Sequence, residues 1–474
     1  MINLNIIHGA FVQVSKMDGK VIQHLLSYKE EIMVKRKMGR NIVQKKKVVT
    51  QYAWAFKDKN MYTFYRGHLS KVIGFLKSKN IPYQINGRSK KLPCRKHNLN
   101  GIILRPDQLE LTEKALQYNR GVIKAPTGSG KSIVISAIMS SYFDSRILVI
   151  THLSDLVTQL KENFEKYLGE EVTKLSSAHP ESFTRITITT IQTLAKLPPE
   201  TYAEEYDVVI VDEAHRISTI KPKKQKDKTY KYGQYLAVLS TMDVAHRFGF
   251  TATLPYIESS KTALEGLIGP VIGELTIAEA ADLSLLAKPQ IKLIKTPIIP
   301  ELEDVKNYRD AYRIGIVAND ARNTLIIQVL EKLMNKGETA LIIVNHVAHG
   351  HWLQDKAKSL LGIKLEYVHG AVDKETRNSI KKRLIAKEIP ATICTSAWIE
   401  GIDLPSLGAV INAGGGKSEI RTIQAIGRGL RKTKDKDTVT IVDFFDPSST
   451  YFVNHFSYRL CLYFEQGWLG TSDF

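Results

Sequence analysis

The sequence predicts an α/β protein with two doubly wound parallel sheets, preceded by a small basic α+β domain. Its 474 residues are enough for about three domains. From residue 98 onward, short apolar runs alternate with stretches of helical spacing, which is the pattern of βαβ units. The runs are continuously apolar, as in parallel strands that are buried on both faces. The first 97 residues differ, because they are strongly basic.

Residues 1–97 are expected to form the small α+β domain. A short turn between two strand-like segments predicts a hairpin over residues 47–65. A helix should follow at residues 69–76, where apolar residues recur at helical spacing. One face of the predicted strand carries three alternating aromatic residues: Tyr52, Trp54 and Phe56. Such a stripe suits a core under the helix, and it also suits stacking on nucleic-acid bases.

Positive charge is concentrated in this first domain. Residues 1–100 hold 21 Lys and Arg against 4 Asp and Glu, a charge of +17, whereas the whole chain has a net charge of +19. This asymmetry indicates binding to nucleic acid or to an anionic membrane surface, although a solvated charged face has the same composition. We expect the densest run, residues 35–47, to contact a phosphate backbone. Its basic residues are Lys35, Arg36, Lys37, Arg40, Lys45, Lys46 and Lys47.

The first alternating block, residues 98–280, contains a phosphate-binding loop. Its strands are expected at 121–125, 147–151, 186–190, 206–211 and 247–251. The string APTGSGKS follows the first strand and precedes an apolar helix, a setting that a chance Gly/Ser turn would lack. The residues expected to bind nucleotide are Ala125, Pro126, Thr127, Gly128, Ser129, Gly130, Lys131 and Ser132.

Each residue type in this loop has a physical role. Gly128 and Gly130 allow a tight turn in which consecutive N–H groups point at phosphate oxygens, and the next helix adds its dipole. Lys131 brings a charge to the β- and γ-phosphates, and the Ser132 hydroxyl ligates Mg²⁺. Ala125 replaces the usual first glycine, but it precedes the amides that face phosphate. The loop therefore predicts ATP and Mg²⁺ as cofactors.

The string DEAH at 212–215 follows a buried strand of the same block. Asp212 is expected at the carboxyl end of that strand, where open α/β sheets bind ligands, and it would hold Mg²⁺. Glu213 would accept a proton from the attacking water. An Asp-Glu pair that caps a surface helix is the alternative. The lysine-rich stretch at 221–233 suits either a surface loop or a nucleic-acid contact.

The second alternating block, residues 281–446, has no phosphate loop. It ends with QAIGRGLR at 424–431, which places Arg428 and Arg431 on one helical face. Such arginines can reach a γ-phosphate as fingers. The tail, residues 447–474, is aromatic and is expected to pack on this block, because exposing that apolar surface would be costly.

The order of these motifs resembles that of superfamily 2 helicases. RPDQ, APTGSGKS, ITHLSDLVTQ, TTIQTL, DEAH and TAT match the first motor domain in order. IIVNH, CTSAWIEGIDLP and QAIGRGLR match the second. The resemblance implies two RecA-like motor domains that hydrolyse ATP, with further functional residues in each. These are Arg105 and Gln108 at adenine, Thr251 and Thr253 for coupling, Gly401 and Asp403 for coupling and nucleotide binding in the second domain, and Gln424 in catalysis. His152, Thr190 and Thr395 would lie along the bound strand, although each also suits an ordinary strand-end position.

Within that superfamily, a compact basic domain before two motor domains resembles the phage UvsW-like branch-migration helicases. The resemblance implies unwinding, branch migration or fork reversal on branched or forked duplex DNA, in recombination, repair or replication. An RNA helicase, a restriction- or repair-type duplex translocase and a nucleotide-switched nucleic-acid scaffold are the alternatives. We expect a monomer in the cytoplasm of a bacterial or phage-infected cell, with replication or recombination proteins as possible partners and without a targeting signal, a membrane span or a zinc site.

Overall fold

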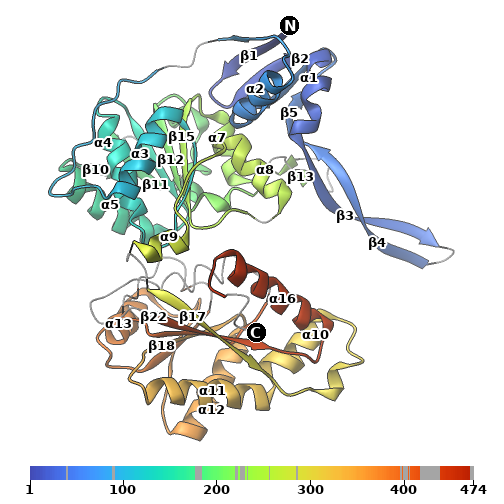
Figure 1. Ribbon diagram of the computed structural model, residues 1–474, viewed down its shortest axis with the longest axis vertical. Coiled ribbons are helices and arrows are strands. Elements are labelled where there is room, and N and C mark those ends of the chain that lie inside the picture. The colour runs from blue at the N-terminus through green and yellow to red at the C-terminus, as the bar shows by residue number, and fades with distance from the viewer. Residues whose placement is uncertain are drawn as a thin grey trace. The chain divides into compact units, whose positions relative to one another are not determined.

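The structure is a computed structural model, shown in Figure 1. It describes residues 1–38, 41–87, 91–176, 184–218, 223–224, 230–231, 233–255, 257–283, 287–395, 398, 404, 406–416 and 438–469. The chain divides into two compact units. The first contains residues 1–125 and 130–274, and the second contains residues 126–129 and 275–474.

The first unit begins with a five-stranded sheet of order β5-β6-β2-β1-β7. Its strands are β1 (Ile2–His8), β2 (Phe11–Ser15), β5 (Trp54–Lys57), β6 (Met61–Tyr65) and β7 (Tyr83–Asn86). Two helices accompany it, α1 (Lys16–Ile22) and α2 (Leu69–Ser78). Val72 and Leu76 of α2 are buried, as their spacing predicts. The small N-terminal α+β sheet that the sequence predicts is confirmed.

Two longer strands, β3 (Ser27–Met38) and β4 (Asn41–Tyr52), pair into an antiparallel ribbon that extends away from this sheet (Figure 1). The hairpin predicted over residues 47–65 is therefore only partly right. Strands β5 and β6 do pair, but residues 47–52 belong to the ribbon. Ala53 separates β4 from β5, and its N–H donates to the carbonyl oxygen of Leu26 (2.7 Å), which closes the base of the ribbon.

The three alternating aromatic residues do not share one buried face. Trp54 is buried, whereas Phe56 is 60% exposed. The cause is a shift of the β5–β6 register between these two residues. A bulge of this kind reverses the side on which the next residue lies, so strict alternation fails.

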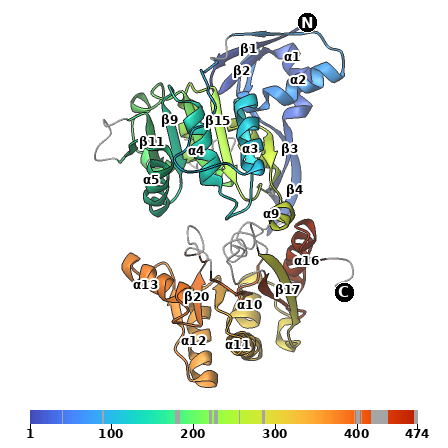
Figure 2. The same ribbon diagram turned by 60° about the vertical axis from the view of Figure 1, so that its left-hand side comes forward.

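The rest of the first unit is built on a seven-stranded parallel sheet of order β10-β11-β9-β12-β15-β8-β16. Its strands are β8 (Arg120–Lys124), β9 (Ile147–Thr151), β10 (Val172–Lys174), β11 (Ile186–Thr190), β12 (Val208–Asp212), β15 (His246–Thr251) and β16 (Val271–Glu274). Figure 2 shows the neighbouring helices α3 (Pro106–Tyr118), α4 (Lys131–Ser141) and α5 (Ser154–Leu168) along this sheet. Helices α6 (Ile191–Leu194), α7 (Gln234–Thr241) and α8 (Glu258–Leu267) form a second group of neighbours.

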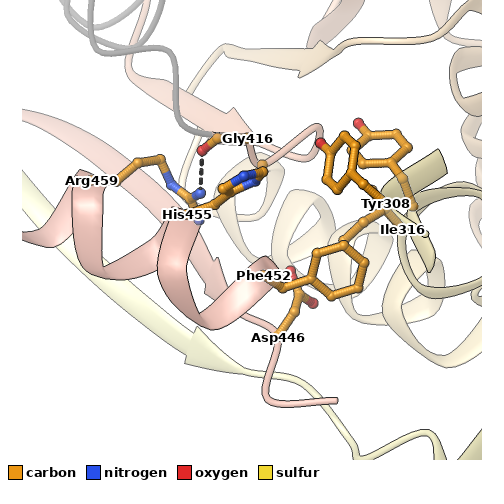
Figure 3. Close-up of a pocket in the computed structure, with 9 residues that line it drawn as sticks. Tyr308, Ile316, Gly416, Asp446, Phe452, His455 and Arg459 are labelled. Carbon is orange, nitrogen blue, oxygen red and sulfur yellow. Dashed lines mark hydrogen bonds between the residues drawn. The ribbon is translucent and has the colours of Figure 1, made fainter. Parts of the chain in front are cut away.

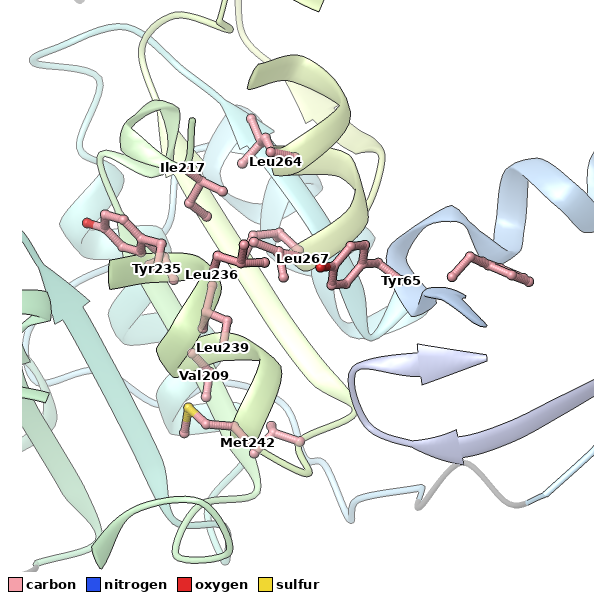
Figure 4. Close-up of a cluster of buried hydrophobic side chains, with 14 of the residues drawn as sticks. Tyr65, Val209, Ile217, Tyr235, Leu236, Leu239, Met242, Leu264 and Leu267 are labelled. Carbon is pink, nitrogen blue, oxygen red and sulfur yellow. The ribbon is translucent and has the colours of Figure 1, made fainter. Parts of the chain in front are cut away.

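The small sheet and the seven-stranded sheet share one hydrophobic core. Tyr65, at the end of β6, lies beside Leu267 of α8 (Figure 4). The backbones also meet, because a Cβ added to Gly67 would lie 1.9 Å from the carbonyl oxygen of Glu265. The two sheets therefore form one packed body rather than two domains joined by a linker.

Three short elements complete the description of the chain up to the second sheet. Two strands, β13 (Lys223–Lys224) and β14 (Tyr230–Lys231), pair within the lysine-rich stretch, most of which lies outside the described residues. Helix α9 (Ile277–Asp282) follows the first unit. Among the described residues, no helix combines the length and apolarity needed to cross a membrane.

The second unit contains a six-stranded parallel sheet of order β17-β22-β21-β18-β20-β19. Its strands are β17 (Lys288–Lys295), β18 (Ala340–Val344), β19 (Glu366–Val368), β20 (Ala391–Thr395), β21 (Ala409–Asn412) and β22 (Thr438–Phe445). Its helices are α10 (Tyr308–Tyr312), α11 (Asp320–Met334), α12 (Val347–Leu361), α13 (Lys374–Ile385) and α16 (Thr450–Glu465). The prediction of two doubly wound sheets is thus confirmed.

Alternate residues of β22 explain how helices cover both faces of this second sheet. Val442 and Phe444 belong to the core that α11 and α12 cover. Asp443, between them, bonds instead to Arg459 and Tyr463 of α16. Because successive strand residues point to opposite faces, α16 lies on the face away from α11 and α12.

Candidate active site

Five parallel strands of the first unit end at one edge of the sheet, and the predicted site residues follow those ends. Strand β12 ends at Asp212, and its neighbour β15 ends at Thr251. Strand β8 pairs with β15 on the other side and leads into the phosphate loop. On the far side of β12, His152 follows β9, whose last residue Thr151 pairs with Thr190 of β11. The fold therefore brings together residues that lie far apart in the sequence.

The phosphate loop has the backbone geometry that its glycines predict. Gly128 (φ +86°) and Gly130 (φ +88°) lie in the left-handed region, where a side chain would be strained. The Ser129 hydroxyl donates to the carbonyl oxygen of Pro126 (2.8 Å), which tightens the turn. Lys131 is the first residue of α4, and its Nζ donates to the carbonyl oxygen of Ala125 (3.1 Å). The lysine ammonium is thus held at the loop.

Gln108 lies directly against this loop. Its Oε1 accepts from the N–H of Arg105 (3.2 Å) in a capping box that starts α3. A Cβ added to Gly130 would lie 2.6 Å from Gln108 Nε2, so any other residue there would displace that amide. Arg105 in turn forms a two-bonded ion pair with Asp107 (3.0 and 2.9 Å). The structure therefore places the RPDQ string beside the loop, as an adenine-recognising element requires.

The two carboxyl groups at the end of β12 are buried. Asp212 is 9% exposed and Glu213 is 7% exposed. Burial, and then the charge of Glu213, raise the pKa of Asp212 to about 6, although Lys131 lowers it in part. Glu213 also has a left-handed backbone (φ +52°), which is unusual for a residue with a side chain. Two buried acids that repel each other form a site that favours a cation.

A divalent cation fits this donor set. Ser132, in the first turn of α4, offers a hydroxyl, and Asp212 offers a carboxylate. Oxygen ligands of this kind, together with phosphate oxygens, are what Mg²⁺ prefers. Its charge would offset the repulsion that raises the pKa of Asp212. That Ser132 and Asp212 hold Mg²⁺ stays a prediction.

His215 is a functional candidate that the sequence prediction missed. Its Nδ1 lies 3.3 Å from Glu213 Oε2 and 3.0 Å from Thr251 Oγ1. Thr251 Oγ1 also donates to the carbonyl oxygen of Thr253 (2.7 Å). A buried chain of contacts thus joins the acidic motif to the TAT motif. The sequence could have indicated this role, because His215 is the last residue of the DEAH motif. A residue that follows a buried strand so closely is expected to be buried near the ends of the neighbouring strands.

The three residues predicted along the bound strand differ in what holds them. Thr190 caps α6, because its Oγ1 accepts from the N–H of Thr193 (3.2 Å). The carbonyl oxygen of His152 accepts from Gln192 Nε2 (3.1 Å). Thr395 is the last residue of β20 in the second unit. A strand-end or capping position accounts for all three, so contact with nucleic acid stays a prediction.

Other predicted residues lie outside what the structure describes. This applies to Gly401, Asp403, Gln424, Arg428, Arg431 and Arg40. The remaining basic residues of the run at 35–47 lie in the two strands of the ribbon. Of these, only Lys47 has a described side chain, and it is exposed. The other five are Lys35, Arg36, Lys37, Lys45 and Lys46.

Two family models match the chain in the order of its two sheets. The model of the res subunit of type III restriction enzymes matches residues 101–256, and the helicase conserved C-terminal domain matches residues 322–433. The chain is 26% identical over 358 residues to the ATP-dependent DNA helicase uvsW of Enterobacteria phage T4, covering 72% of this chain and 68% of that protein. It is 24% identical over 379 residues to the DNA 3'-5' translocase XPB2 of Sulfurisphaera tokodaii, covering 72% of this chain and 81% of that protein.

Solved structures show the same fold. The DNA-bound type ISP restriction-modification enzyme LlaBIII matches with a TM-score of 0.56 and 15% identity, over 84% of this chain and 32% of that one. S. cerevisiae Dbp5 bound to RNA and ADP BeF3 matches with a TM-score of 0.50 and 17% identity, over 77% of this chain and 93% of that one. With its phosphate loop and DEAH motif at one sheet edge, a second parallel sheet and both family matches, the chain belongs to the superfamily 2 helicases.

Proposed function

We propose that this helicase is an ATP-driven motor on DNA whose substrate is branched or forked duplex. Membership of the family makes it an ATP-hydrolysing helicase. The observation that supports a duplex substrate is the basic ribbon, because it belongs to the same compact unit as Lys131, Asp212 and Glu213. The relatives described as a DNA helicase and a DNA translocase support DNA over RNA.

The dimensions and charge of the ribbon suit a duplex. Twelve residues per strand, at about 3.3 Å each, give a length of about 40 Å. One turn of duplex DNA spans about 34 Å, and its major groove admits a two-stranded ribbon. Residues 31–48 hold seven Lys and Arg against one Glu. A ribbon of this kind would follow phosphates over a full turn of duplex beside a branch.

In the proposed reaction, the residues at the carboxyl ends of the first parallel sheet bind and activate ATP. Gln108 and Arg105 recognise adenine, and residues 125–132 hold the triphosphate. Ser132 and Asp212 would hold Mg²⁺, whose charge would offset that of the phosphates. Glu213 accepts the proton of the attacking water.

The second unit supplies the remaining roles in this proposal. Arg428 and Arg431 act as arginine fingers on the charge that develops at the γ-phosphate, together with Gln424. Thr251 and Thr253 couple hydrolysis to domain movement, and Gly401 with Asp403 plays a similar part in the second unit. The DEAH string and complete catalytic set favour a motor over a nucleotide-switched scaffold, which has little need for Glu213.

The test is the rate of ATP hydrolysis with different nucleic acids at equal nucleotide concentration. Forked DNA should stimulate hydrolysis most, then linear duplex, with single-stranded DNA and RNA below them. Unwinding and branch migration of a labelled fork should require ATP and Mg²⁺. Stronger stimulation by RNA than by any DNA would overturn the substrate, and ATP binding without turnover would support the scaffold instead.

The cellular setting is part of the same proposal. We place the enzyme in the cytoplasm of a bacterial or phage-infected cell, acting as a monomer beside replication or recombination proteins. Light scattering during size-exclusion chromatography, with and without a DNA fork, measures the oligomeric state.

A further inference from the structure

The small N-terminal sheet has one face that α1 and α2 cover and one that they do not. On the covered face, residues of β1, β2 and β6 are buried with residues of the two helices. The strand residues are Leu4, Val12, Val14 and Phe64. Because successive strand residues point to opposite faces, the residues between them lie on the other side of the sheet. We call that side the open face, and Asn5, Gln13 and Phe56 belong to it.

One row of the open face crosses all five strands. The register of the sheet places Phe56, Thr63, Gln13, Asn5 and Asn86 side by side in that order. Phe56 is exposed, the three amide residues are half-buried, and only the small Thr63 is buried. Asn86 Nδ2 donates to Asn5 Oδ1 (2.8 Å), so the amides lie close enough to bond to each other. The row thus joins an exposed ring at one edge of the sheet to a line of amide groups.

The exposed ring has few contacts within the protein. Phe56 meets Phe11 edge-to-face, with 5.4 Å between the ring centroids, and among the described residues it contacts no other ring. Tyr308 of the second unit, beside the small pocket in Figure 3, is different. Its ring contacts three other rings of α10 and α16, at 5.7, 5.7 and 5.2 Å. The Phe56 ring, which is 60% exposed, therefore keeps most of its surface for a ligand.

The open face is uncharged within a strongly basic part of the chain. Strands β1, β2, β6 and β7 hold no Asp, Glu, Lys or Arg, although 24% of all residues are charged. A face that only has to remain soluble normally carries charged side chains of both signs. Residues 1–100 have a charge of +17. Such a face suits a polyanion whose uncharged groups lie on the sheet and whose charges lie toward the basic residues around it.

We propose that the open face binds the unpaired strand of branched DNA through its bases. Aromatic rings stack on any base, and Asn and Gln amides can bond to the exposed edges of unpaired bases. A duplex hides the faces of its bases and presents phosphates, for which the open face has no charge. The basic ribbon has that charge, so the two surfaces would bind different parts of one fork. This inference rests on the proposed DNA substrate.

The open face begins where the ribbon ends. Ala53 is the single residue between β4 of the ribbon and β5, and Phe56 lies within β5. Strand β5 is the edge strand of its sheet, and the ribbon and the sheet belong to the same compact unit. A duplex held along the ribbon would therefore have its branch next to the edge of the sheet where Phe56 lies.

The test compares two ligands of the full-length protein, a blunt DNA duplex and the same duplex with an unpaired oligothymidine arm. Phe56→Ala should weaken binding of the armed duplex at least about 5-fold, because stacking of one base on a ring contributes a factor of about 5 to 150 in affinity. The Kd of the blunt duplex should stay within about twofold. The slope of log affinity against log salt should not change for either ligand, because no phosphate contact is lost. Fluorescence anisotropy at several salt concentrations measures both quantities.

The matched control is Tyr118→Ala, which removes an aromatic side chain of similar exposure (57%) from α3 of the same unit. It should leave the Kd of both ligands within about twofold. A second variant, Gln84→Glu, places a negative charge on the open face, since Gln84 lies two residues from Asn86 in β7. It should weaken binding of the armed duplex selectively, because the carboxylate repels the strand. Gln84 and Phe56 are both exposed, so Tm should not change in either variant.

An unchanged Kd of the armed duplex in Phe56→Ala would overturn the inference. A parallel loss of affinity for both ligands would also overturn it, because the open face would then not distinguish unpaired from paired DNA. An unaltered protein that binds the armed duplex no more tightly than the blunt one would overturn it too and would point to a protein partner instead. Failure of the proposed DNA substrate has a different signature, since the unaltered protein would then bind neither ligand.

Discussion

Two neighbouring carboxyl groups with different environments define the chemistry at the residue scale. Burial, reinforced by the charge of Glu213, raises the pKa of Asp212 to about 6. A cation at Asp212 would relieve this repulsion and leave Glu213, which lies 3.3 Å from His215 Nδ1, as the base. The sequence predicted both roles because the strand before DEAH fixes where the acids emerge.

Glu213→Gln should bind ATP and Mg²⁺ as the unaltered protein does and yet hydrolyse ATP about 10²- to 10⁴-fold more slowly. The reason is that glutamine keeps the size of the side chain but accepts no proton. Steady-state turnover and analogue binding measure the two effects. Lys131→Ala is the contrasting variant, because it should weaken triphosphate binding itself. Near-normal turnover in Glu213→Gln would remove Glu213 as the base.

Arg428→Ala and Arg431→Ala should each lower kcat by about 10³-fold with little change in the Kd of ATP. Arginine fingers act mainly on charge that develops in the transition state, so they contribute little to ground-state binding. Single-turnover kinetics beside a nucleotide-binding titration separates the two. Arg383→Ala, a surface arginine of α13 paired with Glu366, is the matched control and should change neither quantity. A variant that lost affinity alone would contradict the finger role.

At the scale of elements, most of the parallel strands were predictable because they are short apolar runs, whereas β10, β16 and β17, which lie at sheet edges, were not predicted. The ribbon was not predicted either, since residues 47–58 read as a single strand. Only the structure shows that Ala53 divides them, because the partner of β4 is β3 and the partner of β5 is β6. Which strands pair is decided by the three-dimensional fold, so it cannot be predicted from the local spacing of apolar residues.

Shortening the ribbon should weaken binding to duplex and forked DNA without unfolding the protein. Replacing residues 31–48 by an Asn-Gly turn joins the paired residues Glu30 and Val49. It keeps the contact from the Lys29 N–H to Glu258 Oε2 (2.7 Å). Each phosphate that the shortened protein no longer neutralises should reduce the slope of log affinity against log salt by about 0.9, so the slope should fall by several units.

The control for this prediction keeps the ribbon at full length. Replacing Lys45, Lys46 and Lys47 by Gln should reduce the slope by up to about three units while Tm is unchanged. Fork unwinding should fall more than ATP hydrolysis in both variants, because a motor with a weaker hold on the duplex slips. If the slope of log affinity against log salt does not change in the shortened protein, the charged residues of the ribbon face water and do not contact phosphates.

A buried histidine at the junction of the two sheets predicts acid sensitivity. Burial, and to a lesser extent Lys71, lower the pKa of His68 to about 3. An unfolded chain takes up this proton near pH 6.5, so the folded state binds fewer protons below that pH. Stability should therefore fall as the pH drops below 6.5, by up to about 1.4 kcal/mol per pH unit from this group.

His68→Leu should reduce the loss of Tm between pH 7 and pH 5.5, because leucine has no proton to bind. Differential scanning calorimetry at both pH values measures the change. The control is the same substitution at His351, an exposed residue of α12. It should leave the difference in Tm between pH 7 and pH 5.5 unchanged. An identical pH dependence in His68→Leu would show that this histidine is protonated in the folded state.

At the scale of the whole molecule, the sequence predicts a basic N-terminal domain that ends at residue 97, whereas the first compact unit continues to Glu274, apart from residues 126–129. The charge difference reports on surface composition and carries no information about the core. The core is continuous, since Tyr65 and Leu267 belong to one cluster. Polar contacts cross the same junction, where Arg120 Nη2 donates to the carbonyl oxygen of Gly9 (3.0 Å).

A chain that starts at Asn98 should therefore lose more than DNA binding. Its truncation removes the apolar cover of Leu267 and the backbone partner of Arg120, which is the first residue of the strand that leads into the phosphate loop. Exposing that core surface at about 25 cal/mol per Å² amounts to several kcal/mol, comparable to the stability of a whole domain. We expect a lower Tm, aggregation and little ATP hydrolysis in the truncated chain. The protein with the shortened ribbon should keep both Tm and basal hydrolysis, because its junction is intact. Thermal unfolding and ATPase assays on the two proteins decide the matter, and a stable, active truncated chain would show that the two sheets fold independently despite their common core.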